Sequence, residues 1–205
     1  MRGQMMDVPL LISSLIEHAG RVHGQQEIVS RTLEGPINRT TWDEVRSRCK
    51  KLAGALDARG IERGDRIGTL AWNTHRHLEV YFALSSMGAI CHTLNPRLHP
   101  SQLVYIVNHA ADRVLFLHST FLPLVEACAD NLKSIDTYVI LGAGENLPET
   151  KLGNLVAYED LIAEHDGDYD WPELDENEAS ALCYTSGTTG NPKGALYSHL
   201  SLIHI

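Results

Sequence analysis

The stretch TSGTTGNPKG at residues 185–194 is the most informative part of this chain, and ASALCY at 179–184 leads directly into it. Residues 179–184 are typical of a short buried strand, and residues 195–197 of a second strand or the approach to a helix. Glycines let backbone N–H groups approach an anion closely, hydroxyls add neutral donors, and Lys193 adds a positive charge. A loop of this composition on a strand predicts a polyphosphate site.

The spacing excludes the commonest phosphate-binding loop. A Walker A motif requires G-x-x-x-x-G-K-[ST], with a helix that opens at the lysine. Here Lys193 lies between Pro192 and Gly194, and no Ser or Thr follows it. The alternative is a polar surface turn, because Gly, Thr, Asn and Pro are all turn residues.

The segment 185–194 resembles, without a mismatch, the signature loop of the adenylate-forming superfamily, which includes acyl-CoA synthetases, firefly luciferase and peptide-synthetase adenylation domains. The resemblance extends over residues 5–199. Three segments are similar to medium- and long-chain fatty acyl-CoA synthetases: TLAWN at 69–73, NPRLHP at 95–100 and residues 103–116. Residues 5–16 and 171–172 are similar to a narrower branch that includes ligases acting on 3-methylmercaptopropionate.

This resemblance implies a two-step activation of a carboxylic acid. The carboxylate attacks the α-phosphorus of Mg²⁺-bound ATP, which gives an acyl-adenylate and pyrophosphate, and the thiol of coenzyme A then displaces AMP. Phosphate charge in such a reaction requires a cation and preorganised donors. The resemblance also implies the residues that hold the β- and γ-phosphates: Thr185, Ser186, Gly187, Thr188, Thr189, Gly190 and Lys193.

Thr185 resembles the hydroxyl that approaches Mg²⁺ in fatty acyl-CoA synthetases. A purely structural Thr185, bonded to its own turn, is the alternative. We assign no role to His199, which we expect to be a hydrogen-bonded structural residue. Arg97 is expected to pair with an acidic residue rather than to bind an anion. We identify no catalytic residue in the chain.

Members of the superfamily are much longer. Beyond the signature loop they carry an adenine-binding segment, a glutamate that completes Mg²⁺ coordination, a ribose-binding aspartate, and a mobile C-terminal domain with a lysine that assists adenylation. We therefore expect a truncated N-terminal fragment without thioester-forming activity. The last six residues, LSLIHI at 200–205, are what the transposon-end string CTGTCTCTTATACACATC encodes, so we expect the natural gene to continue after His199.

Two alternatives stay open. The chain could come from another adenylating enzyme, such as an aryl-CoA ligase or a peptide-synthetase adenylation domain. It could also be a non-catalytic, truncated nucleotide-binding module. The resemblance leaves the acyl substrate undefined, and it implies a homodimer formed through the N-terminal region.

Composition limits the partners. The net charge of −9 argues against a nucleic-acid or anionic-membrane surface, and the most apolar stretch, residues 80–91, is too short to span a bilayer. We detect no signal peptide and expect a cytoplasmic protein. The 4 cysteines form no C-x-x-C pair and are expected to be reduced and buried. No H-E-x-x-H motif occurs, so we expect no histidine metal site.

Apolar periodicity predicts an α/β fold in which parallel strands alternate with helices. Residues 27–31 and 37–40 are predicted to form a pair of strands, and Thr41 with Glu44 a capping box that starts a helix. Further strands are predicted at 65–72, 89–94, 113–118, 138–141 and 179–184. Helices are predicted at 9–20, 74–87, 100–109, 121–129 and 158–163, and Thr74 is expected to cap the one that runs to Met87.

We predict layered, parallel-rich sheets with flanking helices, as in the N-terminal part of the large domain of adenylate-forming enzymes. The predicted organisation has a first subdomain at 1–170 and the start of a second at 171–199, which carries the phosphate loop. Residues 200–205 are predicted to be a non-native tail. Residues 142–170 are predicted to be a loop region with one short helix.

Overall fold

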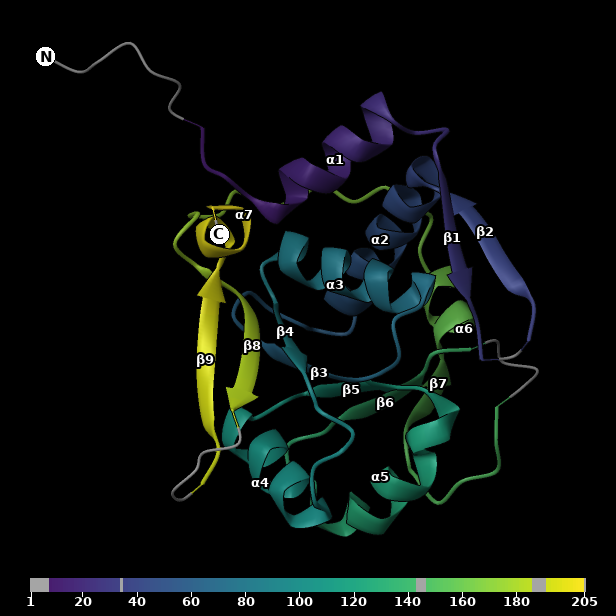
Figure 1. The fold of residues 1–205 in the computed structure, drawn as a ribbon, viewed down its shortest axis with the longest axis vertical. Coiled ribbons are helices and arrows are strands. Elements are labelled where there is room, and N and C mark those ends of the chain that lie inside the picture. Colours follow the sequence, from purple (N-terminus) through teal and green to yellow (C-terminus); the bar gives the residue numbers. More distant parts are fainter. Residues whose placement is uncertain (1–7, 34, 143–146, 186–190, 205) are drawn as a thin grey trace, which may run out of the picture.

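A computed structural model describes residues 8–33, 35–142, 147–185 and 191–204 of the chain. Within these residues a seven-stranded sheet has the order β7-β6-β5-β3-β4-β8-β9 (Figure 1). Its strands are β3 (Arg66–Leu70), β4 (Ile90–Thr93), β5 (Val114–Leu117), β6 (Thr137–Ile140), β7 (Leu155–Ala157), β8 (Ala179–Thr185) and β9 (Lys193–Ser198).

Every neighbouring pair in this sheet is parallel except β8 and β9, which are antiparallel. Parallel neighbours require crossover connections. Helices supply those from β3 to β4, from β4 to β5 and from β5 to β6, whereas no helix lies in the described part of the connection from β6 to β7. The chain moves from β3 to β4 on one side and then returns to place β5 on the other side of β3. The strands therefore end on a common carboxyl edge, where ligands bind in open α/β sheets.

One face of the sheet is covered by α2 (Trp42–Asp57), α3 (His75–Met87) and α6 (Tyr158–Ala163), and α1 (Ile12–Val22) packs on the outer side of α2 and α3. The apolar face of α2 consists of Val45, Cys49, Leu52 and Leu56, all at most 1% exposed. These residues recur at spacings of four, three and four, which places them on one side of a helix. They pack with Ile67 of β3 and neighbouring strand residues into a single cluster.

The opposite face is covered by α4 (Pro100–Ala110) and α5 (Leu122–Cys128), which lie below the sheet in Figure 1. Short 3-10 turns flank α5 at Ser119–Phe121 and Ala129–Asn131. Leu103, Ile106 and Val107 of α4 are buried against Leu115 and neighbouring sheet residues. Helices on both faces make a three-layer α/β/α arrangement.

A separate antiparallel pair, β1 (Glu27–Arg31) and β2 (Ile37–Thr41), leads into α2. The predicted capping box is present: Thr41 Oγ1 accepts from the Glu44 N–H at 3.3 Å, and the Glu44 carboxylate accepts from the Thr41 N–H at 2.9 Å. These bonds satisfy N–H groups that a helix start otherwise leaves without partners.

Because hydrogen bonds from Thr40, then from Thr41, stabilise its ionised form, the Glu44 carboxyl has a pKa below the ordinary 4.5. The stability it contributes is present above pH 4.5 and is lost as pH falls through the lower folded-state pKa. We therefore expect Glu44→Gln to make the free energy of unfolding less dependent on pH below 4.5. Urea denaturation between pH 3 and pH 6 measures this; identical pH slopes for both proteins would contradict it.

The start of α3 differs from expectation. Thr74 occupies the N-cap position with extended backbone, but its side chain makes no capping bond, so the prediction that it caps this helix is wrong. Ser30 of the neighbouring strand β1 performs that task instead, because its hydroxyl accepts from the His75 N–H at 3.3 Å. A hydrogen bond to a residue distant in sequence therefore takes the place of the local capping bond expected from Thr74.

The predicted α/β class and the parallel crossovers are confirmed. The prediction of residues 142–170 as loop with one helix is only partly right, because β7 lies inside it and pairs with β6. This edge strand has three residues, too few for a periodic pattern to reveal. The chain after residue 170 contributes β8 and β9 to the same sheet, and the helix α7 (His199–His204) follows. The domain boundary at 170 and the non-native tail stay predictions.

Candidate functional site: the β8–β9 hairpin

The signature segment forms the connection between two antiparallel strands. Thr185 is the last residue of β8, and it pairs with Lys193, the first residue of β9. The Thr185 hydroxyl donates to the Lys193 carbonyl at 3.5 Å, a long hydrogen bond across the hairpin. The structure thus shows the alternative considered for Thr185, a bond to its own turn, while its approach to Mg²⁺ stays a prediction.

Most of the predicted phosphate ligands lie outside the described residues. These are Ser186, Gly187, Thr188, Thr189 and Gly190. The ladder from Ala179 to Thr185 fixes where this segment begins and ends. Because β8 is parallel to β4, the segment leaves from the carboxyl edge of the parallel strands. That edge is the usual ligand position in such sheets.

Buried contacts fix the first part of β8. Ser180, Ala181 and Leu182 are buried between the helical layers. The ladder is irregular between Ala179 and Ala181, and Ser180 donates its hydroxyl to the Tyr197 carbonyl at 3.2 Å. On the other side, the Ser85 hydroxyl of α3 donates to the Ser180 carbonyl at 3.1 Å. The root of the hairpin is therefore tied to the core.

Lys193 is exposed, and it makes no ion pair with any residue in the described part of the chain. An ammonium group at the mouth of a hairpin is a point charge suited to an anionic ligand. Asn191 is exposed and Pro192 is buried beside it. The hairpin therefore presents Lys193 to solvent while the preceding proline is packed.

Tyr184 precedes the signature segment, and its surroundings were not anticipated from the sequence. Its hydroxyl lies 2.6 Å from Nδ1 of His109 in α4, and its ring lies 5.2 Å from the His92 ring. Burial raises the pKa of Tyr184, and the negative charge of Asp112 adds to that effect. The only local sign of this cluster is the i, i+4 spacing of Tyr105 and His109, which places both rings on one side of a helix.

Behind Tyr184 lies a fully buried pair. Nδ1 of His92 in β4 is 2.8 and 2.9 Å from the two carboxylate oxygens of Asp112, and both side chains are inaccessible. Burial raises the pKa of the Asp112 carboxyl, while the hydrogen bond from His92 opposes the shift. A buried carboxylate needs such a partner, because desolvation without one is costly.

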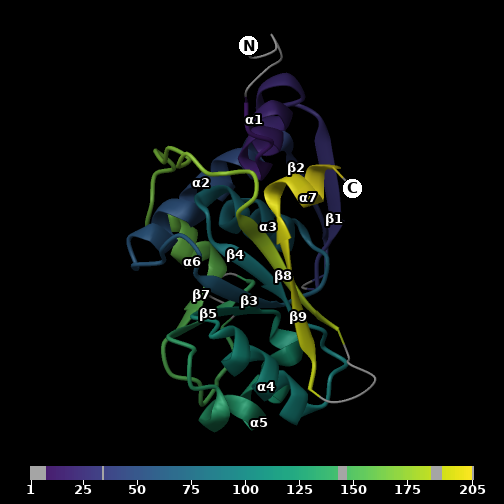
Figure 2. The ribbon, with the colours of Figure 1, turned by 90° about the vertical axis from the view of Figure 1, so that its left-hand side faces the viewer.

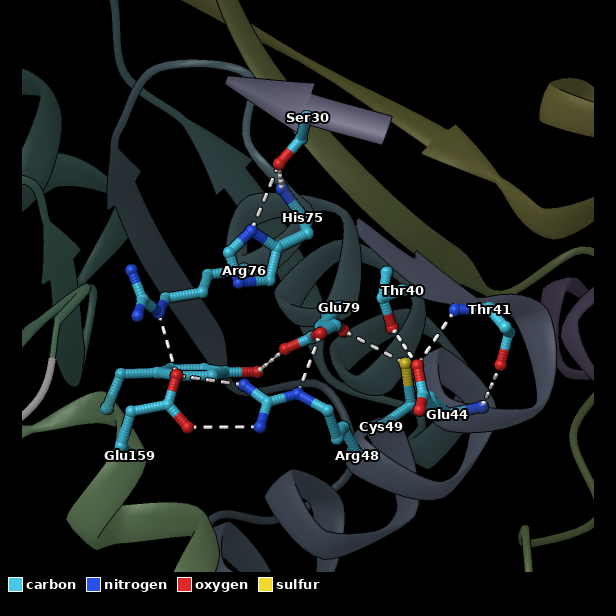
Figure 3. A network of polar contacts seen from close by, with 11 residues as sticks. Ser30, Thr40, Thr41, Glu44, Arg48, Cys49, His75, Arg76, Glu79 and Glu159 are labelled. Atoms are coloured by element: carbon cyan, nitrogen blue, oxygen red, sulfur yellow. Dashed lines mark hydrogen bonds and ion pairs between the residues drawn. The ribbon is translucent and has the colours of Figure 1, made fainter. Parts of the chain in front are cut away.

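A second polar cluster lies at the other end of the sheet, beside β7 (Figure 3). Arg48 of α2 donates from Nε to the Glu79 carboxylate at 2.8 Å. Its two terminal nitrogens donate to the two carboxylate oxygens of Glu159, each at 3.0 Å. Arg76 contacts Glu159 at 2.8 Å, and the Tyr158 hydroxyl donates to Glu79 at 2.7 Å. These bonds compensate for the burial of Glu79, so we interpret the cluster as structural.

Several other sequence predictions can be compared with the structure. His199 is buried, and its Nδ1 accepts from the Ile12 N–H at 3.2 Å, as expected for a structural histidine. Arg97 is exposed and forms no ion pair with the described residues, so the expectation of an acidic partner stays a prediction. Three of the four cysteines are buried and all are free, while Cys183 is half-buried. Among the described residues, no helix is long and apolar enough to cross a membrane.

Comparison with solved structures shows that the fold is similar to that of a CoA ligase. The chain superposes on the crystal structure of an anthranilate CoA ligase in complex with anthranoyl-AMP with a TM-score of 0.82, at 27% identity over 94% of this chain and 36% of that one. The model of the AMP-binding enzyme family matches residues 16–205. The chain belongs to the AMP-binding enzyme family.

Curated relatives are similar over nearly the whole chain. It is 54% identical to a 3-methylmercaptopropionyl-CoA ligase of Ruegeria lacuscaerulensis over 99% of this chain and 38% of the relative. It is 50% identical to a medium-chain-fatty-acid–CoA ligase of Ectopseudomonas oleovorans, over 99% and 37%. It is 44% identical to a long-chain-fatty-acid–CoA ligase of Thermus thermophilus, over 97% and 35%. The chain therefore spans little more than a third of the relatives it matches.

Proposed function

We propose that this chain is the N-terminal part of an ATP-dependent acyl-CoA synthetase. The whole enzyme would convert a carboxylic acid, ATP and coenzyme A into an acyl-CoA by way of an acyl-adenylate. The observation that carries the proposal is the position of the signature segment. It connects β8 and β9 at the carboxyl edge of the parallel strands, with the exposed Lys193 at its end.

In this proposal the hairpin connection holds the β- and γ-phosphates. Lys193 contributes its charge, and the hydroxyls and backbone N–H groups of residues 185–190 contribute hydrogen bonds. Mg²⁺ would complete the charge balance, and Thr185 is the candidate hydroxyl beside it. Its long bond to the Lys193 carbonyl, at 3.5 Å, is easily given up for a stronger partner.

For the acid, we propose a fatty acid or a small thioether acid. The support is the identity of 44–54% to relatives named for such substrates. An aryl acid is the second candidate, because the anthranilate CoA ligase gives a TM-score of 0.82 at a lower identity of 27%. A cytoplasmic location and a homodimer stay predictions.

The test uses both the intact gene product and the 205-residue chain. Amplification of the locus from source DNA gives its complete open reading frame, and the product of that frame is expected to release pyrophosphate only when ATP and a suitable acid are present. Medium- and long-chain fatty acids, 3-methylmercaptopropionate and anthranilate are the acids to compare. Absence of acid-dependent pyrophosphate release with every one of them would contradict the proposal.

The 205-residue chain is expected to form no acyl-CoA, because it spans only 38% of a homologous ligase. Thioester formation is measured as the loss of the free thiol of coenzyme A. The intact product serves as the positive control on the same acid. Acid-dependent turnover by the short chain would show that the catalytic groups lie within it.

A further inference from the structure

Four rings from three elements meet where the signature segment begins. Tyr105 and His109 of α4 stack with centroids 5.3 Å apart, and His109 meets the ring of Tyr184 edge-on at 5.9 Å. The other neighbour of Tyr184 is the ring of His92, at 5.2 Å. Figure 2 shows α4 beside the loop end of the β8–β9 hairpin, where this contact is made. Tyr184 thus links the hairpin to the helical layer below the sheet.

The strand opposite Tyr184 has a glycine at the facing position. Tyr184 pairs with Gly194, and a Cβ added to Gly194 would lie 3.0 Å from Cζ of the tyrosine and 3.1 Å from Cδ1 of Leu182. The ring therefore lies against one side of the Gly194 backbone, where an added Cβ would crowd it by a few tenths of an ångström. Aromatic residues compensate in this way for glycines in edge strands, which have no side chain of their own to pack.

This contact matters because β9 is the edge strand and is mostly exposed. Its residues from Lys193 to Leu196 are all exposed, so packing holds this half of the strand weakly. Lys193 directly precedes Gly194 in the chain. A displacement of Gly194 along or away from β8 would carry the backbone of Lys193 with it, since consecutive Cα atoms are linked at a fixed distance.

The ring of Tyr184 is itself fixed at both ends. Its hydroxyl is hydrogen-bonded to His109 at 2.6 Å, and its ring lies 5.2 Å from the tilted ring of His92, whose Nδ1 is 2.8 Å from the buried Asp112 carboxylate. A tyrosine that only filled space beside Gly194 would not need the hydroxyl bond. The hydrogen bond to His109 holds the Tyr184 ring in one of the positions that its half-buried site permits.

We propose that Tyr184, held by His109, is a positioning residue for Lys193 at the start of β9. By covering Gly194 it fixes the start of β9 and hence the place of Lys193 relative to Thr185. This inference rests on the proposed function, in which Lys193 binds the triphosphate of ATP. Tyr184 acts through the hairpin backbone and does not itself contact the nucleotide.

The test measures binding of Mg²⁺-bound ATP to the 205-residue chain by titration calorimetry. Tyr184→Phe keeps the ring and removes the hydroxyl, and His109→Leu removes its partner. Each is expected to weaken binding about threefold, the equivalent of one modest hydrogen bond. The double variant is expected to be no weaker than either single variant, because both changes remove the same bond. His109→Asn, which retains a polar atom near the position of Nδ1, is expected to restore most of the affinity.

Two further measurements separate positioning from general destabilisation. Thermal unfolding of Tyr184→Phe and His109→Leu is expected to stay close to that of the unsubstituted chain. Amide hydrogen exchange in residues 193–198 is expected to be faster in both variants, with the protection of α2 unchanged. Unaltered ATP affinity in both variants, or a loss in His109→Asn equal to that in His109→Leu, would overturn the inference.

The controls distinguish failure of this inference from failure of the proposed function. If the unsubstituted chain binds ATP and Lys193→Ala weakens binding, the phosphate role of the loop holds. The variants of Tyr184 and His109 then decide the positioning role alone. If the unsubstituted chain binds no ATP, or Lys193→Ala binds it equally well, the phosphate role of the loop fails and the inference fails with it, while acid-dependent pyrophosphate release by the longer gene product decides the proposed function separately.

Discussion

Replacement of Arg48 by Met is expected to lower the free energy of unfolding by about 3–5 kcal/mol, the usual cost of removing one partner of a buried ion pair. The Glu79 side chain is 0% exposed, and Arg48 Nε contacts its carboxylate at 2.8 Å. Burial raises the pKa of Glu79, and the hydrogen bonds from Arg48 and Tyr158 oppose that shift. Without Arg48 the carboxylate must stay buried without its cation or take up a proton, and either costs stability.

A matched double variant identifies the cause. Adding Glu79→Gln to Arg48→Met removes the buried charge and leaves an amide that can still accept from the Tyr158 hydroxyl, which lies 2.7 Å from Glu79 in the structure. We expect the double variant to recover a large part of the loss in urea denaturation. If it is as unstable as Arg48→Met, the lost packing of Arg48 and its contacts to Glu159 determine the effect, and the charge on Glu79 does not.

Replacement of Lys193 by Ala is expected to weaken binding of Mg²⁺-bound ATP about tenfold to a hundredfold. A hydrogen bond to a charged group contributes about 1.5–3 kcal/mol, and each 1.4 kcal/mol corresponds to a tenfold change in affinity. Lys193 is exposed and has no ionic partner within the described part of the chain, so its removal should leave the fold intact. Titration calorimetry measures the affinity, and circular dichroism checks the fold.

Two companion variants refine that prediction. Lys193→Arg keeps the charge and is expected to retain more affinity than Lys193→Ala. Lys133→Ala removes another exposed lysine, which precedes β6 and belongs to neither strand of the hairpin. It is expected to bind ATP as the unsubstituted chain does. A similar loss for Lys133→Ala and Lys193→Ala would indicate only a general effect of net charge.

The elements that were predictable have causes close together in sequence. The capping box of Thr41 and Glu44 predicts the start of α2, and the spacing of the apolar residues of this helix identifies its buried face. The strand β7 was not predicted from the sequence, because it has only three residues and depends on β6 for its hydrogen bonds. The residue that caps α3 was not predicted, because Ser30 lies 45 residues before His75, whose N–H it accepts from.

The site shows the same division. The composition of residues 185–194 predicted a loop attached to a strand, and the structure confirms the two strands that hold it. The contact between Tyr184 and His109 joins residues 75 positions apart, and that between Arg48 and Glu159 joins residues 111 apart. No local pattern specifies such pairs, because the crossovers of the sheet bring them together.

The most direct measurement of the central claim compares three ligands on the unsubstituted 205-residue chain: ATP, inorganic tripolyphosphate and adenosine, each with Mg²⁺. If the hairpin connection binds the phosphates, ATP and tripolyphosphate should bind and compete with one another, while adenosine should bind far more weakly. Lack of measurable binding of both phosphate ligands, or adenosine binding as tightly as ATP, would contradict the assignment of residues 185–194 to the triphosphate.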